Sequence, residues 1–175
     1  MPFDMEPLAA LPLFAGLTSS ELEEIAIHLE VMDKPAATDI IKEGDTQSQP
    51  LFVLLSGAVE VIKRGLDGRG HVISVLSAPS VFGEIEVLAR RPAIAGVTAT
   101  TPVKLALLRR GAFDEMCTAG RPAALKLVRN LAQVLSYRLA ATDERLAAQF
   151  DLSVPAFYEK VKQLRHLIYS GWRAD

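Results

Sequence analysis

The sequence contains a single cysteine, Cys117, among its 175 residues. One cysteine cannot form an internal disulfide bond, which predicts a reducing, cytoplasmic compartment. No run of apolar residues approaches the roughly 18 that a membrane-spanning helix needs. The N-terminal segment, residues 1–7, is acidic where a secretion signal would be basic. We therefore expect a cytoplasmic protein with no membrane partner.

Signatures of catalysis and of metal binding are also missing from the sequence. The three histidines, His28, His71 and His166, lie far apart, and none has a metal-ligand spacing such as H-E-x-x-H. There is no G-x-S-x-G nucleophile elbow and no P-loop. Cys117 is more typical of a small packed hydrophobic residue than of a nucleophile. These absences predict a non-enzymatic protein with no catalytic residue and no metal.

What the chain does contain is enough apolar material for a core, since 50% of its residues are hydrophobic and 23% are charged. Its length fits one compact domain with one or two appended helices. The net charge of -2 hides an asymmetry, because residues 1–50 hold ten acidic and only two basic side chains. Such a split indicates either a nucleic-acid-binding face or two solvated surfaces, and we favour solvated surfaces.

The first predicted helix begins at Thr18, where Thr18 and Glu21 have the spacing of a capping box. Apolar residues then recur at helical spacing, at Leu22, Ile25, Ala26 and Leu29. From Lys34 to about Arg109 the pattern changes to short β-rich runs separated by turn residues, which predicts a sandwich or barrel. The glycines at 65, 68 and 70 separate two predicted strands, so we interpret them as a hairpin tip and not as a phosphate cradle.

The chain returns to helix after Arg110, with a short helix over 112–116 and a long one that begins at Pro122. Seven positions of the long helix have the alternating three- and four-residue spacing of a coiled-coil seam: Leu125, Val128, Ala132, Leu135, Leu139, Thr142 and Leu146. This face could pack on the chain's own barrel or on a second copy. We favour a homodimer through the helix 122–148. A last amphipathic helix is expected over 155–170, with an open role.

One stretch, residues 82–97, carries the functional information. It reads as a strand end, a glycine at Gly83, about one turn of helix, and a loop into another strand. Gly83 permits a close backbone approach, and the N–H groups of residues 84–86 could bind an anion. Glu84 could accept hydrogen bonds from vicinal hydroxyl groups.

This stretch resembles the phosphate-binding cassette of the cyclic-nucleotide-binding domain family. The likeness extends over roughly residues 10–118, through Pro12–Leu17 with its following helix, Ile41–Asp45, and Leu51–Val61. It implies a mainly β fold with flanking helices: a double-stranded β-helix (jelly-roll) barrel, an N-terminal helix and a long C-terminal helix. It also implies two parts, a barrel domain over 1–120 and a helical extension over 121–175. By resemblance the ligand contacts are Phe82, Gly83, Glu84, Ile85, Glu86, Ala93 and Ile94.

The cassette departs from the family's pattern where the cyclic phosphate is gripped. Ala93 stands where the family has an arginine, Glu86 where it usually has a small residue, and Pro79-Ser80 where it has Gly-Asp. Gly83 and Glu84 match. A charge-assisted hydrogen bond is worth roughly 1.5–3 kcal/mol, so losing the arginine costs on the order of ten- to a hundredfold or more in affinity. Arg90 or Arg91 could replace it, but we favour solvent exposure for both.

Three functions are open to such a chain. The first is a sensory module that binds cAMP or cGMP at reduced affinity, another small ligand, or none, and signals through its C-terminal helices. The second is a ligand-free module that binds a protein partner. The third is a transcription regulator of the catabolite-activator type, which needs a winged helix-turn-helix after its dimerising helix. Residues 151–175 are too few for that module, which argues against a nucleic-acid partner.

Overall fold

A computed structural model of the chain describes residues 8, 11–47, 50–150 and 158–163. These residues form two compact units, one within 1–131 and one within 132–175. The first unit contains every strand of the described residues, and the long helix α5 (Pro122–Phe150) begins in it and continues through the second. Of the helix predicted over 155–170, residues 158–163 are helical, and the remainder lies outside the described residues.

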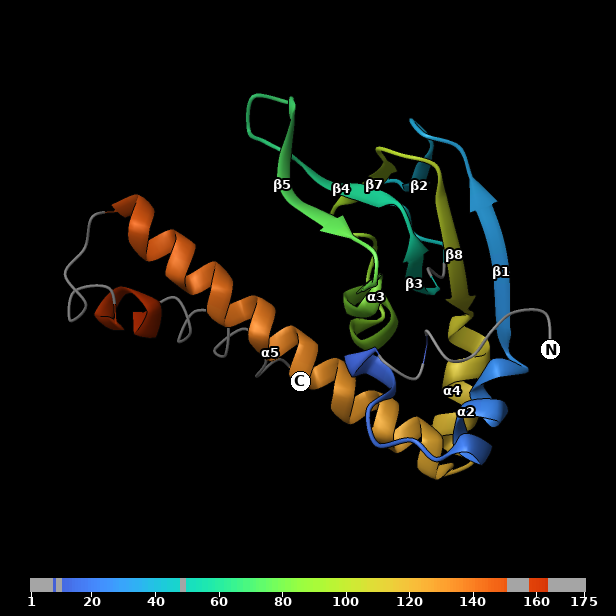
Figure 1. The fold of residues 1–175 in the computed structure, drawn as a ribbon. Coiled ribbons are helices and arrows are strands. Elements are labelled where there is room, and N and C mark those ends of the chain that lie inside the picture. The colour runs from blue at the N-terminus through green and yellow to red at the C-terminus, as the bar shows by residue number, and fades with distance from the viewer. Residues whose placement is uncertain (1–7, 9–10, 48–49, 151–157, 164–175) are drawn as a thin grey trace. The chain divides into compact units, whose positions relative to one another are not determined.

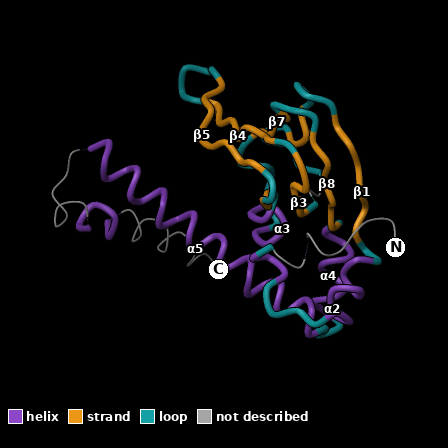
Figure 2. Tube along the Cα trace, in the orientation of Figure 1, coloured by secondary structure: helices purple, strands orange, loops and turns teal. Residues whose placement is uncertain are grey.

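Eight strands of the described residues form two four-stranded sheets in which every pair is antiparallel, as the predicted jelly roll requires (Figures 1 and 2). The first sheet has the order β1 (Leu29–Lys34), β8 (Val103–Leu108), β3 (Leu51–Ser56), β6 (Ser80–Phe82). The second has the order β2 (Asp39–Ile41), β7 (Gly96–Ala99), β4 (Ala58–Arg64), β5 (Gly70–Ser77).

The two central strands of the first sheet, β3 and β8, bury side chains on both faces, which explains why they are nearly continuous apolar runs. Alternate residues of β3 point to opposite sides, so Phe52 and Leu54 join the cluster between the two sheets. Leu51 and Val53 join a second cluster, which the first sheet shares with the helices. The helices of this second cluster are η1 (Pro12–Phe14), α2 (Ser19–Ala26), α3 (Glu84–Ala89), α4 (Arg110–Thr118) and the start of α5.

The predicted capping box is confirmed at the start of α2, where Thr18 and Glu21 exchange side-chain and backbone hydrogen bonds. The predicted helical spacing is wrong at Leu29, because α2 ends at Ala26 and Leu29 begins β1. Leu29 pairs with Leu108 across the first sheet, and a buried ladder position outweighs one more turn of helix. The predicted hairpin tip is confirmed between β4 and β5, with Gly68 in the left-handed region.

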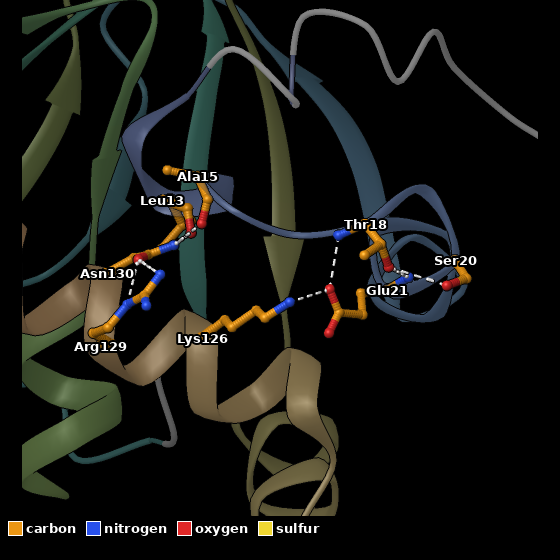
Figure 3. Close-up of polar contacts among 8 residues, drawn as sticks. All are labelled: Leu13, Ala15, Thr18, Ser20, Glu21, Lys126, Arg129 and Asn130. Atoms are coloured by element: carbon orange, nitrogen blue, oxygen red, sulfur yellow. Dashed lines mark hydrogen bonds and ion pairs between the residues drawn. The ribbon is translucent and has the colours of Figure 1, made fainter.

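Polar contacts fasten the start of α5 to residues 13–21 (Figure 3). The Asn130 side chain is 1% exposed, and its amide nitrogen donates to the carbonyl oxygens of Leu13 at 2.8 Å and Ala15 at 3.0 Å. Lys126 forms an ion pair of 2.6 Å with Glu21, and it is the main cause of the lowered pKa of that carboxyl. Ala123, Ala124, Leu127 and Leu131 are fully buried around these contacts.

The predicted coiled-coil seam lies beside that buried face of α5 and not on it. Leu125 is 64% exposed and Leu139 is 55% exposed, while Val128 packs partly on the barrel. The start of the seam, at Leu125 and Val128, is therefore not part of the buried face of α5. No helix among the described residues is both long and apolar enough to cross a bilayer.

Candidate functional site

The cassette joins the two sheets, because it runs from β6 in the first sheet through α3 to β7 in the second. Phe82, the last residue of β6, is buried and stacks on Phe52 of β3 with ring centroids 4.9 Å apart. This stacking fixes the point from which α3 starts. Glu84 and Glu86 are buried on α3 and Ile85 is half-buried.

Gly83 makes the turn from β6 into α3 in the left-handed conformation, with φ of 81°. Only glycine fits there without strain, because a Cβ atom would lie 2.6 Å from the carbonyl oxygen of Pro50. The close backbone approach that the sequence indicated is thus an approach to the protein's own chain.

Glu86 makes contacts in the structure that the sequence did not predict. Its side chain is 6% exposed, and Oε1 accepts a hydrogen bond of 3.0 Å from the backbone N–H of Ile94. Its own backbone oxygen accepts from the Arg110 guanidinium at the start of α4. In sequence this glutamate is a departure from the small residue that the family usually has there. It also holds α3 against the loop that precedes β7.

That loop is tied to the second sheet on its other side. The backbone of Ala93 forms two hydrogen bonds with the turn after β2, donating to Asp45 O at 3.0 Å and accepting from Gly44 N at 2.8 Å. Lys63 of β4 donates to the carbonyl oxygen of Ile94. Lys63 also binds Glu43 at 2.6 Å, and it is the main cause of the lowered pKa of the Glu43 carboxyl.

The position at which the family has an arginine is filled by a methyl group, since the Ala93 side chain is 3% exposed and apolar. The two arginines that could replace it are exposed, as expected. Arg90 forms an ion pair of 3.0 Å with Asp114 of α4. The structure therefore brings Glu86, Ala93 and Ile94 together with Gly83 and Glu84 in one cassette, without a basic side chain at position 93.

Sequence reasoning missed Lys63, Arg110 and the turn 43–45 as parts of this site. Glu43, Gly44 and Asp45 belong to a motif that supported the resemblance, so a signal for the turn was present. Nothing in the local sequence distinguishes Lys63 or the half-buried Arg110 from the other basic residues of the chain. Within the part of the chain that the structure describes, no group of three or more His, Cys, Asp or Glu side chains could hold a metal ion.

Two antiparallel sheets bridged by a short glycine-started helix and a tethered loop define a jelly-roll domain. Comparison with known proteins makes this assignment specific. Residues 33–119 match the cyclic nucleotide-binding domain family, and the chain belongs to that family.

The chain is similar to two bacterial proteins. It is 28% identical over 162 residues to the CRP-like cAMP-activated global transcriptional regulator of Mycobacterium tuberculosis, covering 93% of this chain and 69% of that protein. The catabolite activator protein of Thermus thermophilus has a TM-score of 0.69 and 25% identity, over 79% of this chain and 63% of that one.

A third relative bears on the cassette. The regulatory subunit of a cAMP-independent protein kinase A from Trypanosoma brucei is 27% identical, with a TM-score of 0.63 over 74% of this chain and 46% of that one. A second structure of that subunit carries three substitutions and is bound to cAMP in its A site. The substitutions replace a glutamate by alanine, a threonine by arginine and the adjoining valine by alanine.

Proposed function

We propose that the chain is a non-enzymatic regulatory module whose cassette binds cAMP or cGMP only at reduced affinity, and that its input is therefore not an ordinary cyclic-nucleotide signal. The observation that carries this proposal is the hydrogen bond from Ile94 N–H to Glu86 Oε1, beside an alanine in place of the arginine. The carboxylate uses a donor of the cassette loop and adds a negative charge where a phosphate would lie.

Magnitudes support the reduced affinity. One charge-assisted hydrogen bond from an arginine to a phosphate contributes roughly 1.5–3 kcal/mol, or roughly 10- to 150-fold in the dissociation constant. Glu86 lowers the affinity further, because a bound phosphate must either displace the buried carboxylate or lie next to its negative charge.

The Trypanosoma brucei subunit supports the same interpretation. Its substituted glutamate and threonine have the same separation in sequence as Glu86 and Ala93, and its valine follows the threonine as Ile94 follows Ala93. That subunit belongs to a cAMP-independent kinase, and the structure bound to cAMP is the one with all three residues changed.

Calorimetric titration of cAMP and cGMP tests the proposal. The triple variant Glu86→Ala/Ala93→Arg/Ile94→Ala should bind cAMP at least about tenfold more tightly than the wild-type chain. The matched control is Glu86→Ala/Ile94→Ala, which lacks the new guanidinium and should gain less. A wild-type chain that binds cAMP as tightly as the triple variant would refute the proposal.

We propose that the output passes through α5 in a homodimer. A parallel, in-register pair would cover the exposed seam, whose polar member Thr142 already donates its hydroxyl to Arg138 O at 2.8 Å. In sedimentation equilibrium, Leu139→Glu should dissociate the pair. Tyr137→Glu changes an even more exposed side chain away from the seam and should not. A monomeric wild-type chain would contradict this part of the proposal.

A ligand-free protein-interaction module is the second candidate, because the cassette loop is bonded by the protein itself. The same titration separates the two. Weak saturable heats from either nucleotide support the sensory module, and none at high concentration supports the ligand-free module.

A further inference from the structure

We infer that Glu86 is an internal substitute for a ligand anion, so that the cassette loop keeps its position against α3 and the barrel when no ligand is bound. This inference rests on the proposed function, and it goes further by assigning Glu86 a positioning role. A carboxylate that merely repelled anions would need no partner in the loop.

The backbone of the loop is fully accounted for at its two central residues. Ala93 N–H and C=O bond to Asp45 and Gly44, Ile94 N–H bonds to Glu86, and Ile94 C=O accepts from Lys63. Buried backbone polar groups need partners, and here four groups have four partners, all of them from the chain. The bond to Glu86 is the one among them that joins the loop to α3.

Glu86 is held in place at its backbone and at its side-chain carboxylate, so it connects α3 to the loop. Its backbone lies in α3, where Arg90 N donates to Glu86 O at 3.0 Å, and Arg110 of α4 donates to the same oxygen. Its side chain is 6% exposed and reaches the loop eight residues further along the chain. A buried carboxylate in a charge-assisted bond to a backbone N–H is the same interaction that a bound phosphate makes with such a group.

The consequence is a module whose cassette loop is already held in place before any cyclic nucleotide binds. With Glu86 in place, α3 and the loop are joined in the absence of ligand. Removing the acceptor should free the loop from α3 and leave its bonds to Gly44, Asp45 and Lys63 in place. The loop would then depend on an added anion for the missing contact.

Hydrogen exchange of the Ile94 amide, followed by NMR on the full chain, tests this role. The matched pair is Glu86→Gln, which keeps an acceptor, and Glu86→Met, which has similar length without one. Exchange of Ile94 should accelerate at least about tenfold in the Met variant and by much less in the Gln variant. Amides of β3 serve as the reference for global unfolding in each variant.

The result that overturns the inference is equal exchange of Ile94 in the Gln and Met variants, because a packing role does not distinguish them. A second measurement uses Glu86→Ala/Ala93→Arg/Ile94→Ala, in which added cAMP should slow exchange at position 94, while it leaves the wild-type amide unchanged. No slowing in a triple variant that binds cAMP by calorimetry also overturns the inference. Tight cAMP binding by the wild-type chain would instead refute the proposed function, so the two failures are distinguishable.

Discussion

Asn130 is predicted to be the most important polar residue for holding the start of α5 in place within the first unit. The substitution Asn130→Asp exchanges the amide nitrogen for an oxygen with almost no change in shape. The carbonyl oxygens of Leu13 and Ala15 then lose donors at 2.8 and 3.0 Å and face a like-signed oxygen in a position that is 1% exposed. The single side-chain oxygen of Asn130 accepts from Arg129 Nε and Nη2 at 3.4 Å, and an aspartate keeps this acceptor.

The magnitude follows from the two carbonyl groups. A buried acceptor left without its donor costs about 1–3 kcal/mol, so the two together predict a loss of about 2–6 kcal/mol. This is a large fraction of the roughly 5–15 kcal/mol that a domain of this kind has in total.

Urea unfolding followed by far-UV circular dichroism measures this loss. All variants are compared at one protein concentration, because association would shift the apparent stability. The control Gln133→Glu makes the same amide-to-carboxylate change at an exposed position three residues further along α5, and it should stay within about 0.5 kcal/mol of wild type. The reasoning is refuted if Asn130→Asp is no more destabilising than this control.

Three further predictions follow from the structure. The pKa of the Glu21 carboxyl is lowered, chiefly because Lys126 donates a hydrogen bond to it. The stability that this contact contributes is therefore present above the unfolded-state pKa and is lost as the pH falls through the folded-state pKa. The melting-temperature deficit of Lys126→Met should be largest at neutral pH and shrink in acid, with exposed Lys42→Met as the control, and a deficit independent of pH would contradict this prediction. Arg138 precedes the seam residue Leu139 and Asp143 follows the seam residue Thr142, so Arg138 of one helix and Asp143 of the other would face each other across a parallel dimer. Arg138→Glu should weaken dimerisation about 3- to 30-fold in sedimentation, and adding Asp143→Arg should restore it. An additive loss in the double variant would exclude the parallel pairing. Gly83→Ala should lower the free energy of unfolding by at least about 2 kcal/mol, because φ is positive there and the added Cβ atom would collide with the carbonyl oxygen of Pro50. The control Gly111→Ala adds a Cβ atom in open space on α4 and should be neutral or stabilising. Equal effects of the two substitutions would refute the close approach at Gly83.

Local signals predicted much of the fold. The capping box placed the start of α2 at Thr18, and β-rich runs separated by turn residues indicated a sandwich or barrel from Lys34 to about Arg109. The spacing of Leu29 after Ala26 continued the helical period and concealed β1, whose formation depends on pairing with β8 across the sheet. β6 has only three residues, which is too short a run for an alternation to show.

The sequence identified the residues of the cassette but did not predict the hydrogen bonds between them. Glu86 and Ala93 could be recognised as departures because the surrounding cassette matches the family's pattern. The bond between Glu86 and Ile94 depends on the loop returning beside α3. Lys63 and Arg110 reach the cassette from 31 and 24 residues away in sequence. Such contacts are set by the packing of the two sheets and α4, which local spacing does not encode.

The central claim is that Glu86 holds the donor that a ligand phosphate would otherwise use. A crystal structure of the wild-type chain grown with excess cAMP tests it most directly. The account predicts Glu86 Oε1 within hydrogen-bonding distance of Ile94 N and no phosphate oxygen on that nitrogen. A cyclic phosphate bound to Ile94 N, with the Glu86 side chain turned out of the cassette, would contradict it.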